Sequence, residues 1–276
     1  MQPVSFEIEP FFLNGEQGSL FCIHLYPAHT APKGAILYLH PFAEEMHKSR
    51  RMAALQARRF AAEGYVVLQV DLTGCGDSAC DFGDATWETW LADARRAHAW
   101  LLANTTGPIV LWGLRTGASL AVELATKISG IQCLILWQPV VNGEQYLSQF
   151  LRIKLASEML SGNQAQGETK DLRAKLEAGE NIEVGGYLLG AAMARDLTRL
   201  KLADIPPPCP VAWLEAGVEE GDSPSPASQR IVDAWRAGGV HVHTRTILGE
   251  PFWVTQEITE CISLIEATTE TLRECK

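Results

Sequence analysis

The stretch Ile109–Ser119, with the sequence IVLWGLRTGAS, constrains the fold more than any other part of the chain. Its first four residues form an apolar run, which is typical of a short buried strand. A Gly-x-x-x-Gly turn follows, in which glycine lets the backbone close without a Cβ clash. Residues Ala118–Ser129 then show the pattern of a helix. A strand, a tight turn and a helix in this order predict that the middle side chain of the turn, Arg115, projects into a cleft.

Short apolar runs alternate with helical patterns along most of the chain. We predict strands at Ser5–Phe11, Leu20–Tyr26, Gly34–Leu39, Tyr65–Val70, Ile131–Trp137, Val211–Leu214 and Val240–Ile247. Helices are expected at Arg50–Glu63, Thr86–Ala103, Ala227–Ala237 and Thr255–Arg273. This alternation favours an α/β fold with a mostly parallel sheet covered by helices on both faces. Ligands in such folds bind beyond the carboxyl ends of the strands.

The middle of the chain departs from this alternation. Residues 140–204 contain no convincing strand, and helices are predicted at Gln145–Leu160, Lys170–Ala178 and Leu188–Leu202. The proline-rich stretch Ile205–Pro210 is typical of a stiff linker that returns the chain to the core. The expected organisation is therefore a first part of the core at 1–140, a helical cap insertion at 141–205 and a second part of the core at 206–276.

Charge and composition limit the partners and the location. The 276 residues carry a net charge of −10, which argues against a nucleic-acid or anionic membrane surface. No apolar run reaches 18 residues, so we expect no membrane span. Residues 1–10 lack the basic and apolar regions of a secretory signal. The seven cysteines are scattered, odd in number and free of CxxC pairs, which favours reduced thiols and a cytoplasmic location.

The turn around Arg115 resembles the nucleophile elbow Gly-x-Ser-x-Gly of α/β-hydrolases, with arginine in place of serine. A guanidinium group only donates hydrogen bonds and cannot attack a carbonyl carbon. In that fold the acid of the triad follows the seventh strand, where Asp222 stands with Glu219 and Glu220 as competitors. The histidine belongs after the last strand, where this chain has Glu250. The usual Ser-His-Asp triad is therefore not found.

A backbone anion hole remains plausible in this fold. The loop His40–Arg51 connects a strand to a helix, and Pro41 lacks an N–H group. We expect the N–H groups of Phe42 and Thr116 to converge instead. Because His40, Asp71–Ser78, Arg115 and Gln138 all follow the carboxyl ends of strands, we expect them to surround one cleft.

Arg115 needs a partner at this position. A cation at a helix start costs about 0.3–1 kcal/mol, and a positive φ at the elbow costs about 1–3 kcal/mol. A carboxylate is expected to offset this, with Glu250 as the first candidate and Glu44 or Glu45 as the next. The residues expected to line the cleft and bind a ligand are His40, Glu44, Glu45, Arg115 and Glu250.

Other reactive side chains give weaker signals. Cys75 lies in the loop DLTGCGDS, which we interpret as structural, and Ser119 follows the elbow by one helical turn. The Ser119 hydroxyl should point back along the helix rather than into the cleft. His241 and His243 share one strand face but have no evident third ligand. We therefore expect neither a metal nor a cofactor.

Six long segments resemble the exosortase A system-associated hydrolases of the second type, a bacterial α/β-hydrolase branch encoded beside exosortase and exopolysaccharide genes. The segments are HPFAEEMHKSRR (40–51), MAALQ (52–56), DLTGCGDSACDFGDATW (71–87), WGLRTGA (112–118), WQPVV (137–141) and PFWVTQE (251–257). The resemblance implies the α/β-hydrolase fold, a cytoplasmic location, arginine at the elbow, and a link to surface polysaccharide or PEP-CTERM protein export. The word hydrolase in that family name rests on the fold.

Two functions stay open, and with them the question of whether the chain is an enzyme. In the first, a capped cleft without catalytic activity binds a small molecule, such as an anionic glycolipid or acyl-phosphate precursor, or contacts a protein of the export system. In the second, the chain is an esterase or related acyl hydrolase. Its nucleophile would then be a non-standard side chain, such as Cys75 or Ser119, or a water molecule activated by a carboxylate.

Overall fold

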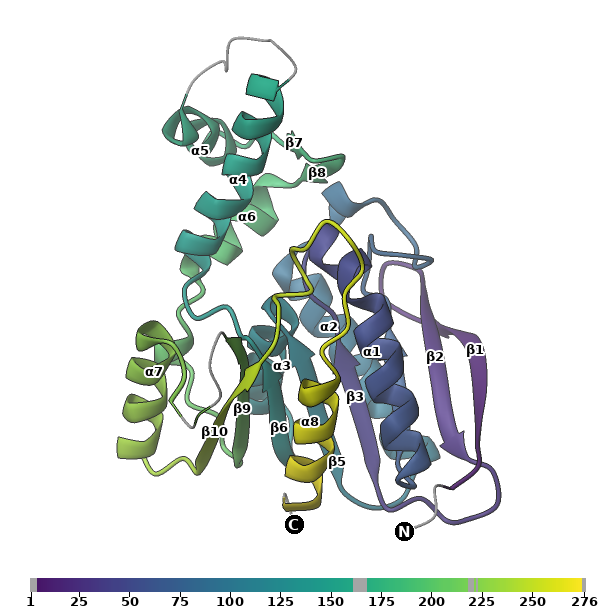
Figure 1. The fold of residues 1–276 in the computed structure, drawn as a ribbon. Helices are drawn as coiled ribbons and strands as arrows, with labels where there is room; N and C mark the ends of the chain where they lie inside the picture. Colours follow the sequence, from purple (N-terminus) through teal and green to yellow (C-terminus); the bar gives the residue numbers. More distant parts are fainter. Residues whose placement is uncertain (1–3, 161–167, 218–220, 222, 275–276) are drawn as a thin grey trace.

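The computed structural model describes residues 4–160, 168–217, 221 and 223–274 and contains an eight-stranded sheet (Figure 1). The strand order is β1-β2-β4-β3-β5-β6-β9-β10. The two β1–β2 and β2–β4 pairs are antiparallel, and the remaining pairs are parallel. The strands are β1 (Phe6–Asn14), β2 (Ser19–Pro27), β3 (Ala35–Leu39), β4 (Val66–Val70), β5 (Ile109–Leu114), β6 (Ile131–Trp137), β9 (Val211–Gly217) and β10 (Val242–Leu248). The predicted sheet, mostly parallel, is confirmed.

Helices cover both faces of this sheet, each over its own apolar core. On one face lie α1 (Glu44–Ala62) and α8 (Ile262–Glu274), and on the other lie α2 (Trp87–Asn104), α3 (Thr116–Lys127) and α7 (Pro226–Ala237). Residues of β5 alternate between the two cores, as side chains on a strand do. The fold is thus the doubly covered α/β architecture that the sequence predicts.

Several predicted boundaries differ from the structure. Helix α1 begins at Glu44 rather than at Arg50, with two carboxylates in its first turn, where the helix dipole favours negative charge. Helix α8 begins at Ile262 rather than at Thr255. Residues 249–261 form a loop instead. In this loop Phe252 and Trp253 are buried in the same apolar core as residues of α1 and α8.

Between β6 and β9 the chain leaves the sheet and forms a separate helical segment above it (Figure 1). This α4–α6 segment contains α4 (Gly143–Leu160), α5 (Thr169–Glu177), α6 (Ala191–Arg199) and the 3₁₀ turn η2 (Leu202–Asp204). The prediction of no strand here is wrong, because β7 (Ile182–Val184) and β8 (Tyr187–Leu189) form a small hairpin. Its turn uses two glycines with positive φ, and its three-residue strands are too short to show an alternating pattern.

None of the helices in the described part of the chain combines the length and the hydrophobicity needed to cross a membrane.

Candidate functional site

The turn between β5 and α3 has the geometry of a nucleophile elbow. Arg115 has φ 55° and ψ −118°, and its backbone N–H donates to the carbonyl of Trp137 (2.9 Å). A Cβ on Gly117 would lie 2.1 Å from the Leu39 carbonyl oxygen and 2.4 Å from that of His40. Only glycine fits this contact, so the end of β3 closes directly against the start of α3. The positive φ costs Arg115 about 1–3 kcal/mol.

The Arg115 side chain is held from four directions. Its Nε donates to Glu45 Oε1 (3.2 Å), and its Nη1 donates to the Gln138 carbonyl oxygen (3.3 Å). The guanidinium carbon lies 5.6 Å from the ring centre of Tyr146 and 5.5 Å from that of Trp253, within the range of cation–π attraction. The expected ion pair with a carboxylate is present, and Glu45 is the partner.

Glu45 has a second polar partner in the α4–α6 segment. Its Oε2 accepts a hydrogen bond from the hydroxyl of Tyr146 (3.2 Å). The side chains of Arg115 and Glu45 are only 16% and 13% exposed. Burial raises the pKa of Glu45, while Arg115 and Tyr146 oppose this shift. Burial and the Glu45 carboxylate raise the pKa of Tyr146 well above its usual value, so this phenol keeps its proton and acts as a donor.

A cavity of about 400 Å³ opens beside this ion pair. Four aromatic side chains contribute to its walls, namely Phe42, Tyr146, Phe150 and Trp253. Four charged side chains also line it, namely Glu44, Glu45, Lys48 and Arg115. Two aliphatic side chains of the lining, Ile153 and Val254, are largely exposed and give the cavity an apolar mouth. The cavity therefore combines apolar walls with a few polar groups, as small-molecule sites do.

The loop after β10 contributes differently from the sequence prediction. Glu250 is exposed, and the carboxylate on Arg115 comes from Glu45 instead, so Glu250 is not the partner that the prediction placed first. The loop supplies Trp253 and Val254 to the cavity. The predicted triad acid Asp222 and its competitors Glu219 and Glu220 lie outside the described residues.

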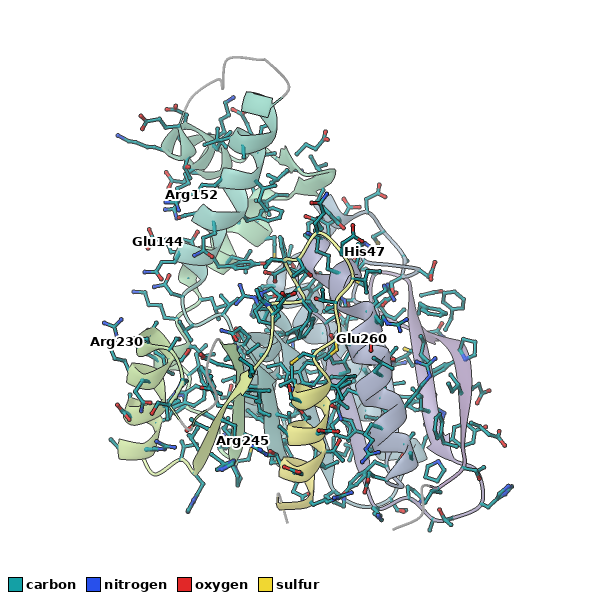
Figure 2. All side chains as sticks on the ribbon, in the orientation of Figure 1. His47, Glu144, Arg152, Arg230, Arg245 and Glu260 are labelled. Atoms are coloured by element: carbon teal, nitrogen blue, oxygen red, sulfur yellow. The ribbon has the colours of Figure 1, made fainter. Side chains whose placement is uncertain are left out.

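Contacts to α1 anchor this loop. Lys48 donates to the Val254 carbonyl oxygen (3.4 Å), and Arg51 forms an ion pair with Glu260. Figure 2 shows Glu260 beside α1, whereas Glu144 and Arg152 project from α4 in the helical segment above. The loop is thus tied to the same helix that carries Glu45, which fixes Trp253 over Arg115.

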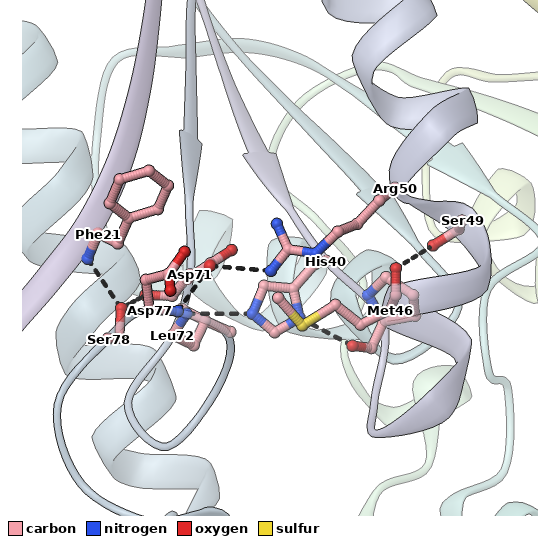
Figure 3. Close-up of polar contacts among 10 residues, drawn as sticks. Phe21, His40, Met46, Ser49, Arg50, Asp71, Leu72, Asp77 and Ser78 are labelled. Atoms are coloured by element: carbon pink, nitrogen blue, oxygen red, sulfur yellow. Dashed lines mark hydrogen bonds and ion pairs between the residues drawn. The ribbon is translucent and has the colours of Figure 1, made fainter. Parts of the chain in front are cut away.

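The prediction placed His40 in the cleft of Arg115, but His40 is not among the residues that line that cavity. Its ring is buried, its Nε2 accepts from the Leu72 N–H (3.0 Å), and its Nδ1 lies 2.8 Å from the Pro41 carbonyl oxygen (Figure 3). Burial lowers the pKa of this imidazole, so the ring is neutral and carries its proton on Nδ1. With Arg50 and Asp71 it lines a separate cavity of about 190 Å³. Its role is structural because both ring nitrogens are used.

The loop Asp71–Ser78 is likewise a structural element. Asp71 Oδ2 accepts from Arg50 Nη2 (2.9 Å) and from the Asp77 N–H (3.2 Å), and Ser78 Oγ accepts from the Phe21 N–H (2.8 Å) (Figure 3). A Cβ on Gly76 would collide with the Asp71 carboxylate at 1.9 Å. The structural interpretation of this loop agrees with these contacts.

The two alternative nucleophiles are not among the residues that line the cavity. Cys75 is buried, and burial together with Asp71 raises the pKa of its thiol, which keeps it in the unreactive protonated form. Ser119 Oγ donates to the Val140 carbonyl oxygen (2.8 Å). It also lies 3.4 Å from the carbonyl oxygen of Arg115, one helical turn earlier in the chain. The expected direction of the Ser119 hydroxyl is confirmed.

Phe42 and Thr116 are both fully buried, and Phe42 lines the cavity. The convergence of their N–H groups stays a prediction. His241 and His243 are exposed, and within the described ranges no group of three or more His, Cys, Asp or Glu side chains is arranged to hold a metal ion.

Sequence reasoning missed Tyr146 and Trp253, the two rings that hold Arg115. Tyr146 lies in a predicted helix with no feature that marks it. Trp253 had one usable signal, because it lies in the loop where the fold places its catalytic histidine.

Comparison with known proteins assigns the chain to a family. Residues 30–179, more than half of the chain, match the family described as serine aminopeptidase S33. The chain belongs to the serine aminopeptidase S33 family. Among solved structures, Est1E from Butyrivibrio proteoclasticus with bound ferulic acid is 16% identical, with a TM-score of 0.69 over 96% of this chain and 98% of that one.

Two further structures lead to the same fold. A thermostable carboxyl esterase from Bacillus coagulans is 15% identical, with a TM-score of 0.66 over 99% of both chains. Proline iminopeptidase from Mycobacterium smegmatis is 13% identical, with a TM-score of 0.62 over 97% of this chain and 98% of that one. No curated protein sequence matches the chain. At these identities the structures establish the α/β-hydrolase fold for this S33 family member.

Proposed function

We propose that this S33 family member binds a small anionic ligand in the cavity beside Arg115 and does not catalyse hydrolysis through a serine triad. The observation that carries the proposal is the elbow itself, which keeps its strained backbone while presenting a guanidinium group held by Glu45. Among the described residues that line the cavity there is no serine, threonine, cysteine or histidine. The binding groups of a pocket are present without a nucleophile and its base.

The lining supports a ligand with an apolar body and an anionic group. Phe150 and Trp253 offer apolar surface, while Arg115 and Lys48 are the cations of the cavity. Guanidinium groups bind carboxylates and phosphates with directed hydrogen bonds. We propose that residues 141–205 act as the cap of this pocket, because Tyr146 and Phe150 reach into it from α4.

The link to exopolysaccharide or PEP-CTERM protein export is also a proposal. Segments that carry the resemblance to the exosortase-associated hydrolases contribute to this site, since they contain Glu45, Arg115, Gln138 and Trp253. The proposed link implies that the ligand is an anionic glycolipid or acyl-phosphate precursor in the cytoplasm. It also makes a protein of the export system the candidate partner.

The second candidate is an acyl hydrolase that uses carboxylate-activated water. It is favoured by Glu44, whose side chain is 51% exposed and lines the same cavity, so a water molecule can reach it.

The melting temperature of the protein, measured with anionic ligands, tests the proposal. Ferulate, the anion of the acid present in the Est1E structure, is a suitable probe, because ligand binding raises apparent stability. We expect a saturable rise in the wild type and none in Arg115→Gln, with Arg245→Gln on the surface as the control that keeps the rise. Turnover of p-nitrophenyl acetate or butyrate that a single cavity substitution abolishes would contradict the proposal and support the second candidate.

A further inference from the structure

The Glu45 carboxylate sits in a binding site made by other parts of the chain. Each of its oxygens has one donor, Arg115 Nε on Oε1 and the Tyr146 hydroxyl on Oε2. One donor comes from the β5–α3 turn and the other from α4. A guanidinium and a hydroxyl placed on the two oxygens of a planar group form the kind of charge-assisted contact by which proteins recognise carboxylic acids.

Both donors have further contacts besides Glu45. The Arg115 guanidinium also contacts the Gln138 carbonyl oxygen and lies against the rings of Tyr146 and Trp253. Tyr146 is itself buried and packs near Phe42. Removal of the Glu45 carboxylate would therefore leave a preorganised site rather than a collapsed one.

Glu45, by contrast, borders the cavity. It stands in the first turn of α1, next to Glu44, and its side chain lines the cavity. Within the described structure two contacts hold its carboxylate, namely the ion-paired hydrogen bond from Arg115 and the hydrogen bond from Tyr146. Burial raises the pKa of Glu45, which means that its charged form loses solvation in this position and regains it on moving toward water.

We infer that Glu45 occupies the place of a ligand's carboxylate, and that the natural ligand of this cavity is a carboxylic acid that displaces Glu45 from Arg115 and Tyr146. The inference rests on the proposed function, whose ligand class it narrows. Of the two ligand classes proposed above, an acyl phosphate fits less well than a glycolipid that carries a carboxylate, because a phosphate group adds a third oxygen and a second charge in a cavity that Glu44 also lines. The apolar part of the acid would lie between Phe150 and Trp253, with its far end toward Ile153 and Val254.

The test uses Glu45→Ala with acetate and benzoate as probes. We expect both anions to raise the melting temperature of Glu45→Ala in a saturable way, with apparent dissociation constants at least tenfold lower than in the wild type. Phosphate at the same ionic strength should give no saturable rise. Glu270→Ala is the matched control, because it also removes the carboxylate partner of an arginine, Arg245, on the remote surface shown in Figure 2. The inference would be overturned if acetate and benzoate raised the melting temperatures of Glu45→Ala, Glu270→Ala and the wild type equally. It would also be overturned if phosphate raised the melting temperature of Glu45→Ala as much as these carboxylates do.

A second variant covers the case in which Glu45→Ala does not fold. Glu45→Gln keeps the shape of the side chain and removes its charge, so benzoate should bind at least fivefold more tightly than to the wild type in calorimetric titration. Adding Tyr146→Phe to either variant should weaken benzoate binding. Unchanged affinity in Glu45→Gln would overturn the inference. Ester turnover by the wild type would contradict the proposed function alone, because the carboxylate response of the Glu45 variants does not depend on it.

Discussion

Arg115 illustrates how a costly residue is stabilised by its surroundings. Its positive φ costs about 1–3 kcal/mol, and its position at the start of α3 opposes the helix dipole. The ion pair with Glu45, the hydrogen bond to Gln138 and the rings of Tyr146 and Trp253 act against this cost. A cation over a ring contributes about 0.5–1 kcal/mol at exposed sites and about 2 kcal/mol when desolvated. The contacts around the side chain are thus of the size needed to keep the strained backbone.

A double-mutant cycle measures this dependence. Arg115→Gln leaves the Glu45 carboxylate without its cation. We expect a loss of about 2 kcal/mol, below the usual cost for a fully buried pair, because both side chains are partly exposed. Glu45→Gln should cost a similar amount. The double variant should lose less than the sum, with a coupling of about 1–3 kcal/mol in urea unfolding. Strict additivity would mean that the pair does not stabilise the protein.

His40 predicts a dependence of stability on pH. Burial lowers the pKa of the imidazole in the folded protein below its usual value of 6.5, so the unfolded chain binds a proton first as the pH falls. Stability from the neutral ring is present above pH 6.5 and is lost as the pH falls through the lowered folded pKa, by up to about 1.4 kcal/mol per pH unit. His40→Gln should flatten this slope in urea unfolding between pH 6.5 and 5. An unchanged slope in His40→Gln would contradict the assignment.

At the scale of elements, the sheet, its flanking helices and the elbow could be predicted from the sequence, because buried strands give continuous apolar runs and the Gly-x-x-x-Gly turn has few conformations. The carboxylate partner of Arg115 could be predicted as a type, since a cation at this position needs an anion. Which carboxylate forms the pair could not be predicted, because α1 begins at Glu44, six residues before the predicted start, and this places Glu45 in its first turn. The β7–β8 hairpin and the loop before α8 depend on tertiary contacts of Tyr187 and Trp253 that leave no periodic pattern.

The closure of β3 against α3 gives a prediction at this scale. Gly117→Ala would place a Cβ 2.1 Å from the Leu39 carbonyl oxygen, a contact that only movement of the elbow can relieve. We expect a loss of more than 3 kcal/mol or failure to fold. Gly130→Ala in the turn between α3 and β6, where nothing lies within 4 Å, should cost about 1 kcal/mol through its positive φ. Similar melting temperatures for the two variants would contradict the close contact.

At the scale of the whole molecule, the site joins parts that are distant in the sequence. Glu45 comes from α1, Arg115 from the elbow, Tyr146 from the α4–α6 segment and Trp253 from the loop before α8. Arg115 therefore links the helical segment above the sheet to the core, at the turn where α/β-hydrolases carry their nucleophile.

Tyr146→Phe tests this link. Loss of the hydroxyl removes one buried hydrogen bond to Glu45, and we expect a cost of about 1–3 kcal/mol with faster amide hydrogen exchange in α4 and unchanged exchange in α8. Tyr26→Phe removes the same kind of bond, to Glu7 on the exposed edge of the sheet, and should change neither helix. Equal exchange in α4 for both variants would show that Tyr146 does not hold the segment.

The reactivity of the wild-type protein toward a fluorophosphonate probe, read as intact mass, tests most directly whether the elbow has lost its nucleophile. With Arg115 in place of serine, we predict no added mass after prolonged incubation at neutral pH, under conditions in which a serine esterase is fully modified. A stoichiometric mass increase that maps to a cavity side chain would contradict the account.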